Sequence, residues 1–313
     1  MKKLFLLLLI ALCSMLSAKE LKVLTIGNSF SASAARTLPW ITASVPGCRI
    51  ILTGANIGGC SLERHWQEWT KAEKDSSYKP YGVCLIDSDK LPVNIKYNRG
   101  NVNELIKNNK YDIITIQQNS ANSWKSETYQ PFAENLIAVL KKYQPQAEII
   151  IQQTWSYRCD SPRLKSWKID NTVMYEKLEA AYAKLSKDYG FRIIPCGYAV
   201  QLFRAATPVK FQRPDMKALE KLKNTKAHAF EGEVVGMCKW RRHKKTKEFY
   251  LSCDTSHLNP HGEFMQGAVW FNVLFGRPAT EVKYLPENMT AEMQKFLLEC
   301  AAKAVANYKH PEK

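Results

Sequence analysis

The sequence predicts an α/β protein, built as a three-layer α/β/α sandwich around a central, mainly parallel sheet. Short apolar runs rich in β-branched residues recur along the chain, and amphipathic stretches with apolar residues at three- and four-residue steps separate them. Repeated alternation of strand and helix covers both faces of a parallel sheet with helices. A chain of 313 residues is long enough for one large domain of this kind.

The first strand is expected at Leu21–Ile26, where an apolar run follows the amino-terminal segment. Gly27-Asn28 break this run, so a helix is expected from Ser31 to Ser44. Further strands are expected at Arg49–Thr53, Asp112–Gln117, Glu148–Gln153 and Arg192–Pro195, and further helices at Tyr129–Lys142, Thr172–Tyr189 and Thr290–Tyr308. Parallel strands end at one edge of the sheet, where open α/β folds bind their ligands.

Two stretches depart from this alternation and are predicted to be insertions, near residues 81–98 and 204–247. Tyr81–Tyr97 alternates apolar and polar residues around the turn Asp87-Ser88-Asp89-Lys90, which predicts a hairpin added to the sandwich. The second insertion is basic and ends in Lys239–Lys247.

A second hairpin is predicted around this basic turn, with strands at Val234–Arg242 and Lys247–Cys253. Centring the hairpin on Lys245-Thr246 places Cys238 directly opposite Cys253, close enough for a disulfide. The chain has nine cysteines, and removing Cys13 leaves eight (9 − 1 = 8), an even number that an oxidising compartment can pair. They are scattered without a Cys-x-x-Cys pair, so neither a metal site nor a cofactor is expected.

The amino terminus has the three-part form of a secretory signal. Lys2-Lys3 precede the apolar run Leu4–Leu12, and small residues end at Ser17-Ala18. We expect residues 1–18 to be a signal peptide, residues 19–313 to form a single domain, and the mature chain to have no transmembrane span. A periplasmic or secreted location is favoured over a lipid anchor, because the bulky Leu12 directly precedes Cys13.

A serine and an Asp-x-x-His segment supply the parts of a hydrolytic site. Ser29 follows the first predicted strand, so its hydroxyl is expected at the carboxyl edge of the sheet. A serine alcohol becomes a good nucleophile when a histidine, oriented by a carboxylate, accepts its proton. Asp254 and His257 are three residues apart, and on a turn or a first helical turn this spacing lets the carboxylate reach the imidazole.

With these residues the chain resembles the SGNH, or GDSL-like, hydrolase superfamily. The usual first block Gly-Asp-Ser is Gly27-Asn28-Ser29 here, and Asp254–His257 matches the last block, Asp-x-x-His. Asn56–Ser61 resembles the second block, and Gln117-Gln118-Asn119 takes the place of the third, Gly-x-Asn. The start Gly-Asn-Ser-Phe-Ser also resembles a secreted bacterial subgroup of undefined function. The blocks occur in the family's order over nearly all of the mature chain.

The resemblance implies an SGNH hydrolase-like, flavodoxin-like fold and a catalytic triad of Ser29, Asp254 and His257. The oxyanion is expected to be held by the amides of Ser29 and Gly59 and by the side chain of Asn119. Gln118 is the alternative donor, because Gln117 replaces a glycine in this block. Each block alone also fits an ordinary turn or helix cap, and the joint occurrence in order favours the hydrolase.

The net charge of +16 favours anionic partners through long-range attraction, although a solvated lysine-rich surface is an equally good explanation. Nucleic acid is disfavoured, because no nucleic-acid-binding motif accompanies the basic run. Four tryptophans near the blocks offer stacking surfaces for sugars or, alternatively, pack in the core: Trp66, Trp69, Trp124 and Trp155. The sequence thus predicts an exported serine esterase acting on short-chain O-acyl groups, above all acetyl groups, of a carbohydrate, including anionic polysaccharides. A lipid or thioester hydrolase and a non-catalytic glycan-binding protein are the alternatives.

Overall fold

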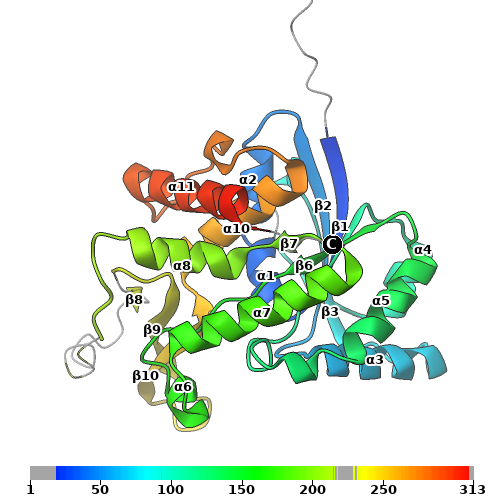
Figure 1. Cartoon of the computed structure of the whole chain (residues 1–313), viewed down its shortest axis with the longest axis horizontal. Coiled ribbons are helices and arrows are strands. Elements are labelled where there is room, and N and C mark those ends of the chain that lie inside the picture. The colour runs from blue at the N-terminus through cyan, green and yellow to red at the C-terminus, as the bar shows by residue number, and fades with distance from the viewer. Residues whose placement is uncertain are drawn as a thin grey trace, which may run out of the picture.

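The computed structural model describes residues 19–309 apart from 93, 214, 216, 218–227 and 230. The predicted signal peptide, residues 1–18, lies outside the described residues. The fold is the predicted three-layer α/β/α sandwich with a mostly parallel central sheet (Figure 1). From one edge to the other, the described strands of this sheet are β4 (Asn98–Gly100), β3 (Tyr81–Asp87), β2 (Cys48–Asn56), β1 (Lys19–Gly27), β5 (Ile113–Ile116), β6 (Glu148–Gln152) and β7 (Ile193–Ile194).

The five parallel strands lie in the order β2-β1-β5-β6-β7. The chain therefore winds outward in both directions from β1 and β5, and this reversal point is where doubly wound sheets open a crevice for ligands. An antiparallel hairpin is present as predicted, but its bounds differ, because the second strand lies beyond Tyr97 and Ser88–Lys90 only begin the connection. β3 pairs antiparallel with β2, and β4, which begins one residue after Tyr97, pairs antiparallel with β3 at the edge of the sheet.

Helices cover both faces of the sheet. On one face, α3 (Leu62–Lys74), α4 (Val102–Asn108) and α5 (Phe132–Tyr143) contact one another. On the other face, α10 (Pro260–Phe275) packs on α1 (Ser29–Ala35) and α2 (Leu38–Ala43). The remaining described helices are α6 (Pro162–Trp167), α7 (Asn171–Tyr189), α8 (Cys196–Ala206), α11 (Ala291–Asn307) and the 3₁₀ turns η1 (Ser88–Lys90), η2 (Ser126–Thr128) and η3 (Ala279–Glu281).

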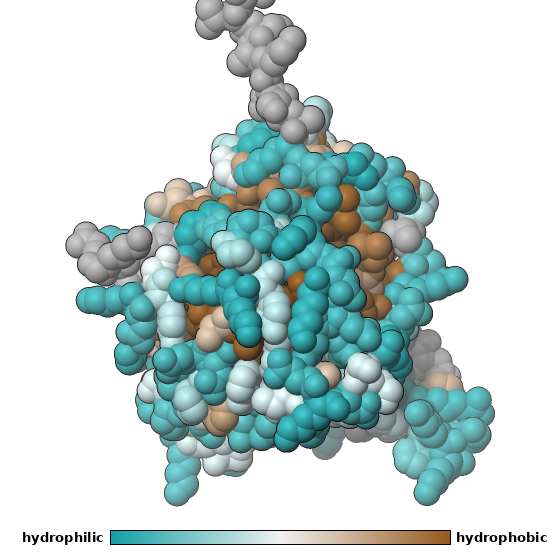
Figure 2. Space-filling view, turned by 90° about the vertical axis from the view of Figure 1, so that its right-hand side faces the viewer, coloured by the Kyte–Doolittle hydropathy of each residue, from teal (hydrophilic) through white to brown (hydrophobic). Residues whose placement is uncertain are grey.

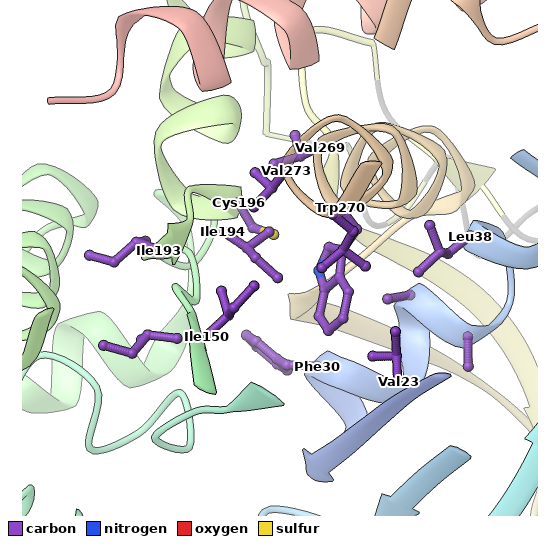
Figure 3. Packing of buried hydrophobic residues seen from close by; sticks show 14 of the residues in the cluster. Val23, Phe30, Leu38, Ile150, Ile193, Ile194, Cys196, Val269, Trp270 and Val273 are labelled. Atoms are coloured by element: carbon purple, nitrogen blue, oxygen red, sulfur yellow. The ribbon is translucent and has the colours of Figure 1, made fainter. Parts of the chain in front are cut away.

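One part of the core lies between α10 and the sheet, and buried residues of α3, α4 and α5 extend it on the other face. Trp270 is fully buried and points from α10 toward the sheet, where Val23 of β1 and Phe30 of α1 lie (Figure 3). The twelve residues from Phe264 to Phe275 are apolar or small at almost every position, and all but Asn272 are buried. This pattern is expected of a helix enclosed on most sides, as α10 is by α1, α2, α8 and α11.

The predicted single helix from Ser31 to Ser44 is wrong, because the structure has two helices there. α1 ends at Ala35 and α2 begins at Leu38. Pro39 occupies the first turn of α2, a position that tolerates the missing N–H group, whereas within one continuous helix the proline would remove a hydrogen bond. Thr37, at the break, instead donates its hydroxyl to the carbonyl of Glu263 in α10 at 2.9 Å.

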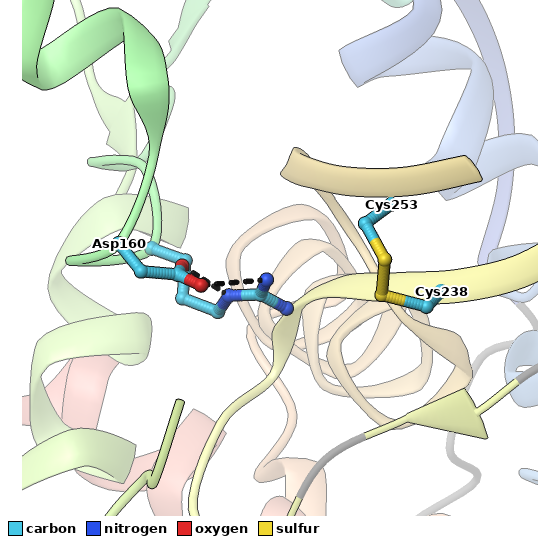
Figure 4. Close-up of a disulfide and its surroundings, with 4 residues drawn as sticks. Asp160, Cys238 and Cys253 are labelled. Carbon is cyan, nitrogen blue, oxygen red and sulfur yellow. Dashed lines mark hydrogen bonds and ion pairs between the residues drawn. A yellow bond between two sulfur atoms is a disulfide. The ribbon is translucent and has the colours of Figure 1, made fainter. Parts of the chain in front are cut away.

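A second, smaller sheet of three described strands begins in the basic insertion and extends past its predicted end at residue 247: β8 (His228–Ala229), β9 (Val235–Arg242) and β10 (Phe249–Leu258), in the order β10-β9-β8. The predicted hairpin register is confirmed, with Cys238 opposite Cys253 and the two joined by a disulfide (Figure 4). Six further described cysteines are free thiols: Cys48, Cys60, Cys84, Cys159, Cys196 and Cys300. The disulfide ties together the two strands of the hairpin that carries Asp254 and His257.

The surface on the side of α3, α4 and α5 is mostly hydrophilic, with hydrophobic residues showing only in patches between charged and polar ones (Figure 2). Within the part of the chain that the structure describes, no helix has the length and apolar character needed to cross a membrane.

Candidate active site

Ser29 lies directly after the carboxyl end of β1, at the first residue of α1. Asn28 caps this helix, since its side-chain Oδ1 accepts a hydrogen bond from the amide of Phe30 at 3.0 Å. The local sequence therefore stops the strand and starts the helix within two residues. As a result the half-buried Ser29 side chain stands at the reversal point between β1 and β5.

The structure brings Ser29, His257 and Asp254 into one hydrogen-bonded chain, although 228 residues separate the serine from the histidine. Ser29 Oγ lies 2.8 Å from His257 Nε2, and His257 Nδ1 lies 2.7 Å from Asp254 Oδ2. A proton on Nδ1 satisfies the carboxylate and leaves Nε2 free to accept the serine proton. This is the geometry of a nucleophile, a base and an orienting acid.

Asp254 and His257 were expected on a turn or a first helical turn, and they lie on an irregular, turn-like part of strand β10. The pairing with β9 shifts between Asp254, opposite Met237, and Leu258, opposite Val235. Two extra residues of β10 bulge out over this interval, and bulges commonly redirect side chains beside active sites. Asp254 Oδ1 accepts hydrogen bonds from the amides of Ser256 at 2.7 Å and His257 at 2.9 Å, which closes the bulge into a turn.

These hydrogen bonds keep Asp254 ionised. Partial burial raises the pKa of its carboxyl, but the hydrogen bonds from the His257 ring and from the amides of His257 and Ser256 outweigh this effect. The resulting pKa lies well below the ordinary value of 3.8. A permanently charged carboxylate is suited to orient the imidazole and to stabilise it when it gains a proton.

A stacked pair of aromatic rings supports His257. Phe30 and Trp155 are parallel within 4° with ring centroids 4.1 Å apart, and Phe30 meets the His257 ring edge-on at 5.3 Å. The Trp155 indole N–H donates to the carbonyl of Ser256 at 2.8 Å. Trp155 is fully buried, as is Trp69. Of the two interpretations open for these tryptophans, core packing is therefore confirmed and sugar stacking is excluded, whereas Trp66 and Trp124 are partly buried.

The segment that follows β6 holds the bulge from the same side as Trp155. The amide of Arg158 donates to Thr255 O at 2.9 Å, and the Thr255 hydroxyl donates to Ser161 Oγ at 2.9 Å. Arg158 is itself buried, and its side chain is paired with Asp160 at 2.6 Å. Asp160 belongs to the surroundings of the Cys238–Cys253 disulfide that Figure 4 shows. Sequence reasoning missed this support. The uncharged run from Gln152 to Tyr157, continuing past the end of β6, is the sequence signal that indicates a buried segment here.

The second and third blocks meet beside Ser29. Asn119 Nδ2 donates to Gly59 O at 2.9 Å, and the turn of Gly59 is tied to the serine loop by a bond from Asn28 Nδ2 to Cys60 O at 3.0 Å. Gly59 has a φ of +63°, a left-handed conformation that favours glycine, and open space surrounds the position where a Cβ would stand. The second block is thus bonded both to Asn119 and to Asn28, the residue next to Ser29, whereas the oxyanion site itself stays a prediction.

Gln118, the alternative donor, is engaged elsewhere. Its buried side chain accepts from the amides of Leu62 at 3.1 Å and Asn119 at 2.8 Å, and its Nε2 donates to Thr128 O at 3.0 Å. Both ends of the amide are thus used in holding the third block together. The Asn119 amide is also engaged at both ends, since its Nδ2 donates to Gly59 O and its Oδ1 accepts from the amide of Asn122 at 2.9 Å. It differs from Gln118 because its half-buried side chain reaches the Gly59 turn.

The two departures from the family's blocks contact each other. Gln117 stands in the place of a glycine, and Asn28 stands in the place of an aspartate. The Nε2 group of Gln117 donates a hydrogen bond to Oδ1 of Asn28 at 2.7 Å. Asn28 at the same time donates to Cys60 O. One amide side chain therefore joins the first three blocks, with both a donor and an acceptor in use.

The triad is open to solvent, with exposed side-chain fractions of 45% for His257 and 38% for Asp254. An apolar cavity of about 480 Å³ lies elsewhere, between α8, α10 and α11, and none of the triad residues lines it. His261, at the start of α10, is among its lining residues. In the described ranges, no cluster of histidine, cysteine or acidic side chains is arranged to hold a metal ion.

Comparison with solved structures identifies a similar protein of similar length. A DUF4886 family protein from Bacteroides uniformis superposes with a TM-score of 0.72 at 23% identity, covering 92% of this chain and 95% of that one. A candidate SGNH hydrolase from Slackia heliotrinireducens gives 0.46 at 16% identity, over 80% and 97% of the chains, and an acetyl xylan esterase gives 0.44 at 12%, over 81% and 99%. The last two likenesses are too distant to bear on activity.

Among curated proteins, none matches this chain in sequence. The family model described as a domain of unknown function, DUF4886, matches residues 22–215, a span that includes Ser29, Gly59 and Asn119. Asp254 and His257 lie beyond the matched span. The chain belongs to the DUF4886 family.

Proposed function

We propose that this protein is an SGNH-type serine esterase that hydrolyses short-chain O-acyl esters, above all acetyl esters, of a carbohydrate. The observation that carries the proposal is the hydrogen-bonded chain from Ser29 Oγ through His257 to Asp254. The four sequence blocks and their meeting at the reversal point of the sheet support it.

Ser29 Oγ attacks the ester carbonyl carbon while His257 Nε2 takes the serine proton. The carbonyl oxygen becomes an oxyanion, held by the amides of Ser29 and Gly59 and by the Asn119 side chain. One such donor contributes roughly 3 kcal/mol of transition-state stabilisation in other hydrolases. The oxyanion collapses to an acyl-enzyme as the C–O bond to the alcohol breaks, and His257 returns the proton to the alcohol. A water, deprotonated by His257, then attacks the acyl-enzyme and releases the acid and free Ser29.

A short acyl group and a hydrophilic alcohol fit the surroundings of the triad. His257 and Asp254 are more than one-third exposed, and the 480 Å³ apolar cavity is lined by other residues. A long acyl chain binds well only where an apolar channel removes it from water, because burial stabilises it by about 0.8 kcal/mol for each CH₂ group. We place the enzyme outside the cytoplasm, a location supported by the amino-terminal signal pattern and by the disulfide.

The test is active-site labelling with a fluorophosphonate probe, coupled to hydrolysis of 4-nitrophenyl acetate and 4-nitrophenyl octanoate. Ser29→Ala should abolish labelling and lower kcat by roughly 10⁴-fold or more, because the triad acts as a unit. Ser31→Ala is the matched control. It removes a hydroxyl of the same helix that bonds Asn28 O and Asn56 Oδ1 at 3.0 Å rather than His257, and should keep the labelling.

Three outcomes bear against the proposal. A folded Ser29→Ala variant that keeps most of the activity excludes Ser29 as nucleophile. A strong preference for octanoate over acetate moves the assignment to a lipid hydrolase. Absence of both labelling and turnover in the folded wild-type protein leaves a non-catalytic glycan-binding protein of the same fold.

A further inference from the structure

The hairpin that carries Asp254 and His257 has a strongly basic end. Six lysines and arginines lie between residues 239 and 247: Lys239, Arg241, Arg242, Lys244, Lys245 and Lys247. All six are exposed. Among the described residues, no carboxylate lies within ion-pair distance of any of them, whereas Arg36, Arg49, Arg158, Arg192, Arg204 and Arg277 are all paired.

The strand register places two of these cations on the same face as the triad acid. Tyr250 is paired with Arg241, Ser252 with Lys239, and Asp254 with Met237. Directly paired residues of antiparallel strands share a face, as do residues two apart along one strand. Arg241, Tyr250, Lys239 and Ser252 therefore form a continuous row, here called the basic strip, that leads along the hairpin to Asp254.

The basic strip is the open face of the hairpin. Lys239, Arg241 and Tyr250 are exposed, with Tyr250 47% exposed. The opposite face carries Cys238, which is fully buried, and Trp240, which is partly buried. This opposite face becomes exposed toward the turn, at Arg242 and Phe249, whereas Lys239 and Arg241 face outward on the side that continues toward the triad.

The chemistry of the strip is suited to a chain of anionic sugars. Lys239 and Arg241 are two residues apart, roughly 7 Å along the strand, so they repel each other unless an anion lies between them. At the end of the strip, the side chains of Arg241, Arg242, His243, Lys244, Lys245 and Tyr250 line an open hollow of about 710 Å³. Guanidinium groups bind carboxylates and sulfates through paired hydrogen bonds, and the ring of Tyr250 offers a flat surface on which a sugar can pack.

We propose that the basic strip binds an anionic polysaccharide, one carrying uronic-acid carboxylates or sulfate groups, and leads its O-acyl groups toward Ser29. Delivery to Ser29 rests on the proposed esterase function, whereas binding does not. The polysaccharide is preferred to a membrane surface because residues 243–247, His-Lys-Lys-Thr-Lys, contain no apolar side chain to insert into lipid, and the exposed Phe249 beside them lies on the face opposite to the strip. It is preferred to single-stranded nucleic acid because the strip has one aromatic ring, where base stacking uses a series of them.

The experiment measures binding without turnover. The full-length Ser29→Ala protein is titrated with polygalacturonate, and with neutral xylan for comparison, at 20 and 300 mM NaCl. Polygalacturonate should bind more tightly than xylan, and its affinity should fall several-fold at the higher salt concentration because screening weakens attraction between exposed charges. Adding Lys239→Gln and Arg241→Gln should weaken polygalacturonate binding by roughly fivefold, as expected for two exposed ion pairs. The matched control is Lys141→Gln with Lys142→Gln, which removes two charges from α5 and should leave the affinity unchanged.

The outcomes separate the proposal from its alternatives. Equal loss of affinity in both double variants, salt-independent binding, or equal affinity for xylan would overturn it. So would tighter binding to vesicles of phosphatidylserine and phosphatidylcholine, or to oligo(dT), than to polygalacturonate. If the strip variant alone loses the polymer while the wild-type chain fails to react with the fluorophosphonate probe, the binding site stands and the esterase does not. Thermal melting of each variant verifies folding, which these exposed side chains should not affect.

Discussion

Asn28 shows how one residue can serve the fold beside a nucleophile without taking part in the chemistry. Its side chain caps α1 through Phe30 N, accepts from Gln117 Nε2 at 2.7 Å and donates to Cys60 O at 3.0 Å. The Gln117 side chain is long enough to reach Asn28 from the end of β5. The glycine that is usual at this position has no side chain and could not make this bond. The two replacements are therefore a matched pair, and the amide is needed because its partners include both a donor and an acceptor.

Asn28→Asp, the residue usual in the family, should for this reason destabilise the protein. The change keeps the acceptor for Phe30 and Gln117 but loses the donor to Cys60 O, and it places two oxygens in contact in a buried position. The loss should amount to about 1–3 kcal/mol of unfolding free energy, the cost of an unsatisfied buried polar group. Urea denaturation measures it. Unchanged stability would mean that the second block does not depend on the bond from Asn28 to Cys60.

At the scale of elements, the irregular part of β10 is held by the segment that follows β6 of the large sheet. Trp155 and Arg158 contact Ser256 O and Thr255 O respectively, so the residues that follow β6 set the shape of the bulge. The bulge in turn sets the direction of His257. We regard Trp155 as a positioning residue, since it acts through Ser256 and Phe30 and does not touch Ser29.

Trp155→Phe tests this role. Phenylalanine can keep the stacking on Phe30 but cannot donate to Ser256 O, so kcat should fall by roughly 3- to 10-fold with little change in KM, consistent with the loss of about one hydrogen bond. Trp69→Phe is the control, because Trp69 is equally buried and its indole N–H has no acceptor among the described residues. Equal changes in kcat for both variants would show that only packing matters.

The Cys238–Cys253 disulfide constrains the same hairpin, because it joins strands β9 and β10. It closes a span of 15 residues, Cys238 to Cys253, and ends one residue before Asp254. Replacing both cysteines by alanine should lower the unfolding free energy by about 3 kcal/mol, the value that the chain-entropy account gives for a loop of this length. Cys159→Ala, at the exposed free thiol, should have no such effect. The comparison uses thermal or urea melting of the oxidised proteins, and equal stability of all three would contradict it.

At the scale of the whole molecule, α10 joins the two halves of the site. It follows β10 immediately and packs on α1 and α2, and Gln266 Nε2 donates to Phe30 O at 2.8 Å, next to Ser29. Arg36 and Thr37 likewise bond to Glu263. The carboxyl-terminal part of the chain, which supplies the base, is thereby fixed against the amino-terminal part, which supplies the nucleophile.

Gly267 marks the closest approach in this contact. A Cβ added there would lie 2.5 Å from Thr37 Oγ1 and 2.8 Å from Ile41 Cδ1. Gly267→Ala should therefore push α10 away from α2 and cost about 1–3 kcal/mol, as overpacking does in other cores. Gly58→Ala is the control for stability, since a Cβ at Gly58 would meet no atom within 4 Å. Equal melting temperatures for the two variants would show that the helices can separate without cost.

The sequence by itself predicted the parallel strands, part of the helices, the paired register of the Cys238–Cys253 hairpin and the residues that now surround Ser29. It did not identify the buried helix α10. The predicted features are local: apolar periodicity, turn residues and hairpin symmetry depend on neighbours in the chain. The end of α1 was missed, although Pro39 marks it, because the amphipathic pattern continues past the break.

Only the tertiary structure decided how these residues meet. The two-residue bulge between Asp254 and Leu258, the burial of Trp155, the bond from Gln117 to Asn28 and the engagement of Gln118 all involve partners from distant parts of the chain. Residues in a bulge do not pair with the neighbouring strand, so their backbone groups need hydrogen-bond partners elsewhere. Whether a bulge forms therefore depends on another part of the chain that can supply those partners. Here the residues after β6 offer hydrogen-bond partners at Thr255 and Ser256, and those contacts turn His257 toward Ser29.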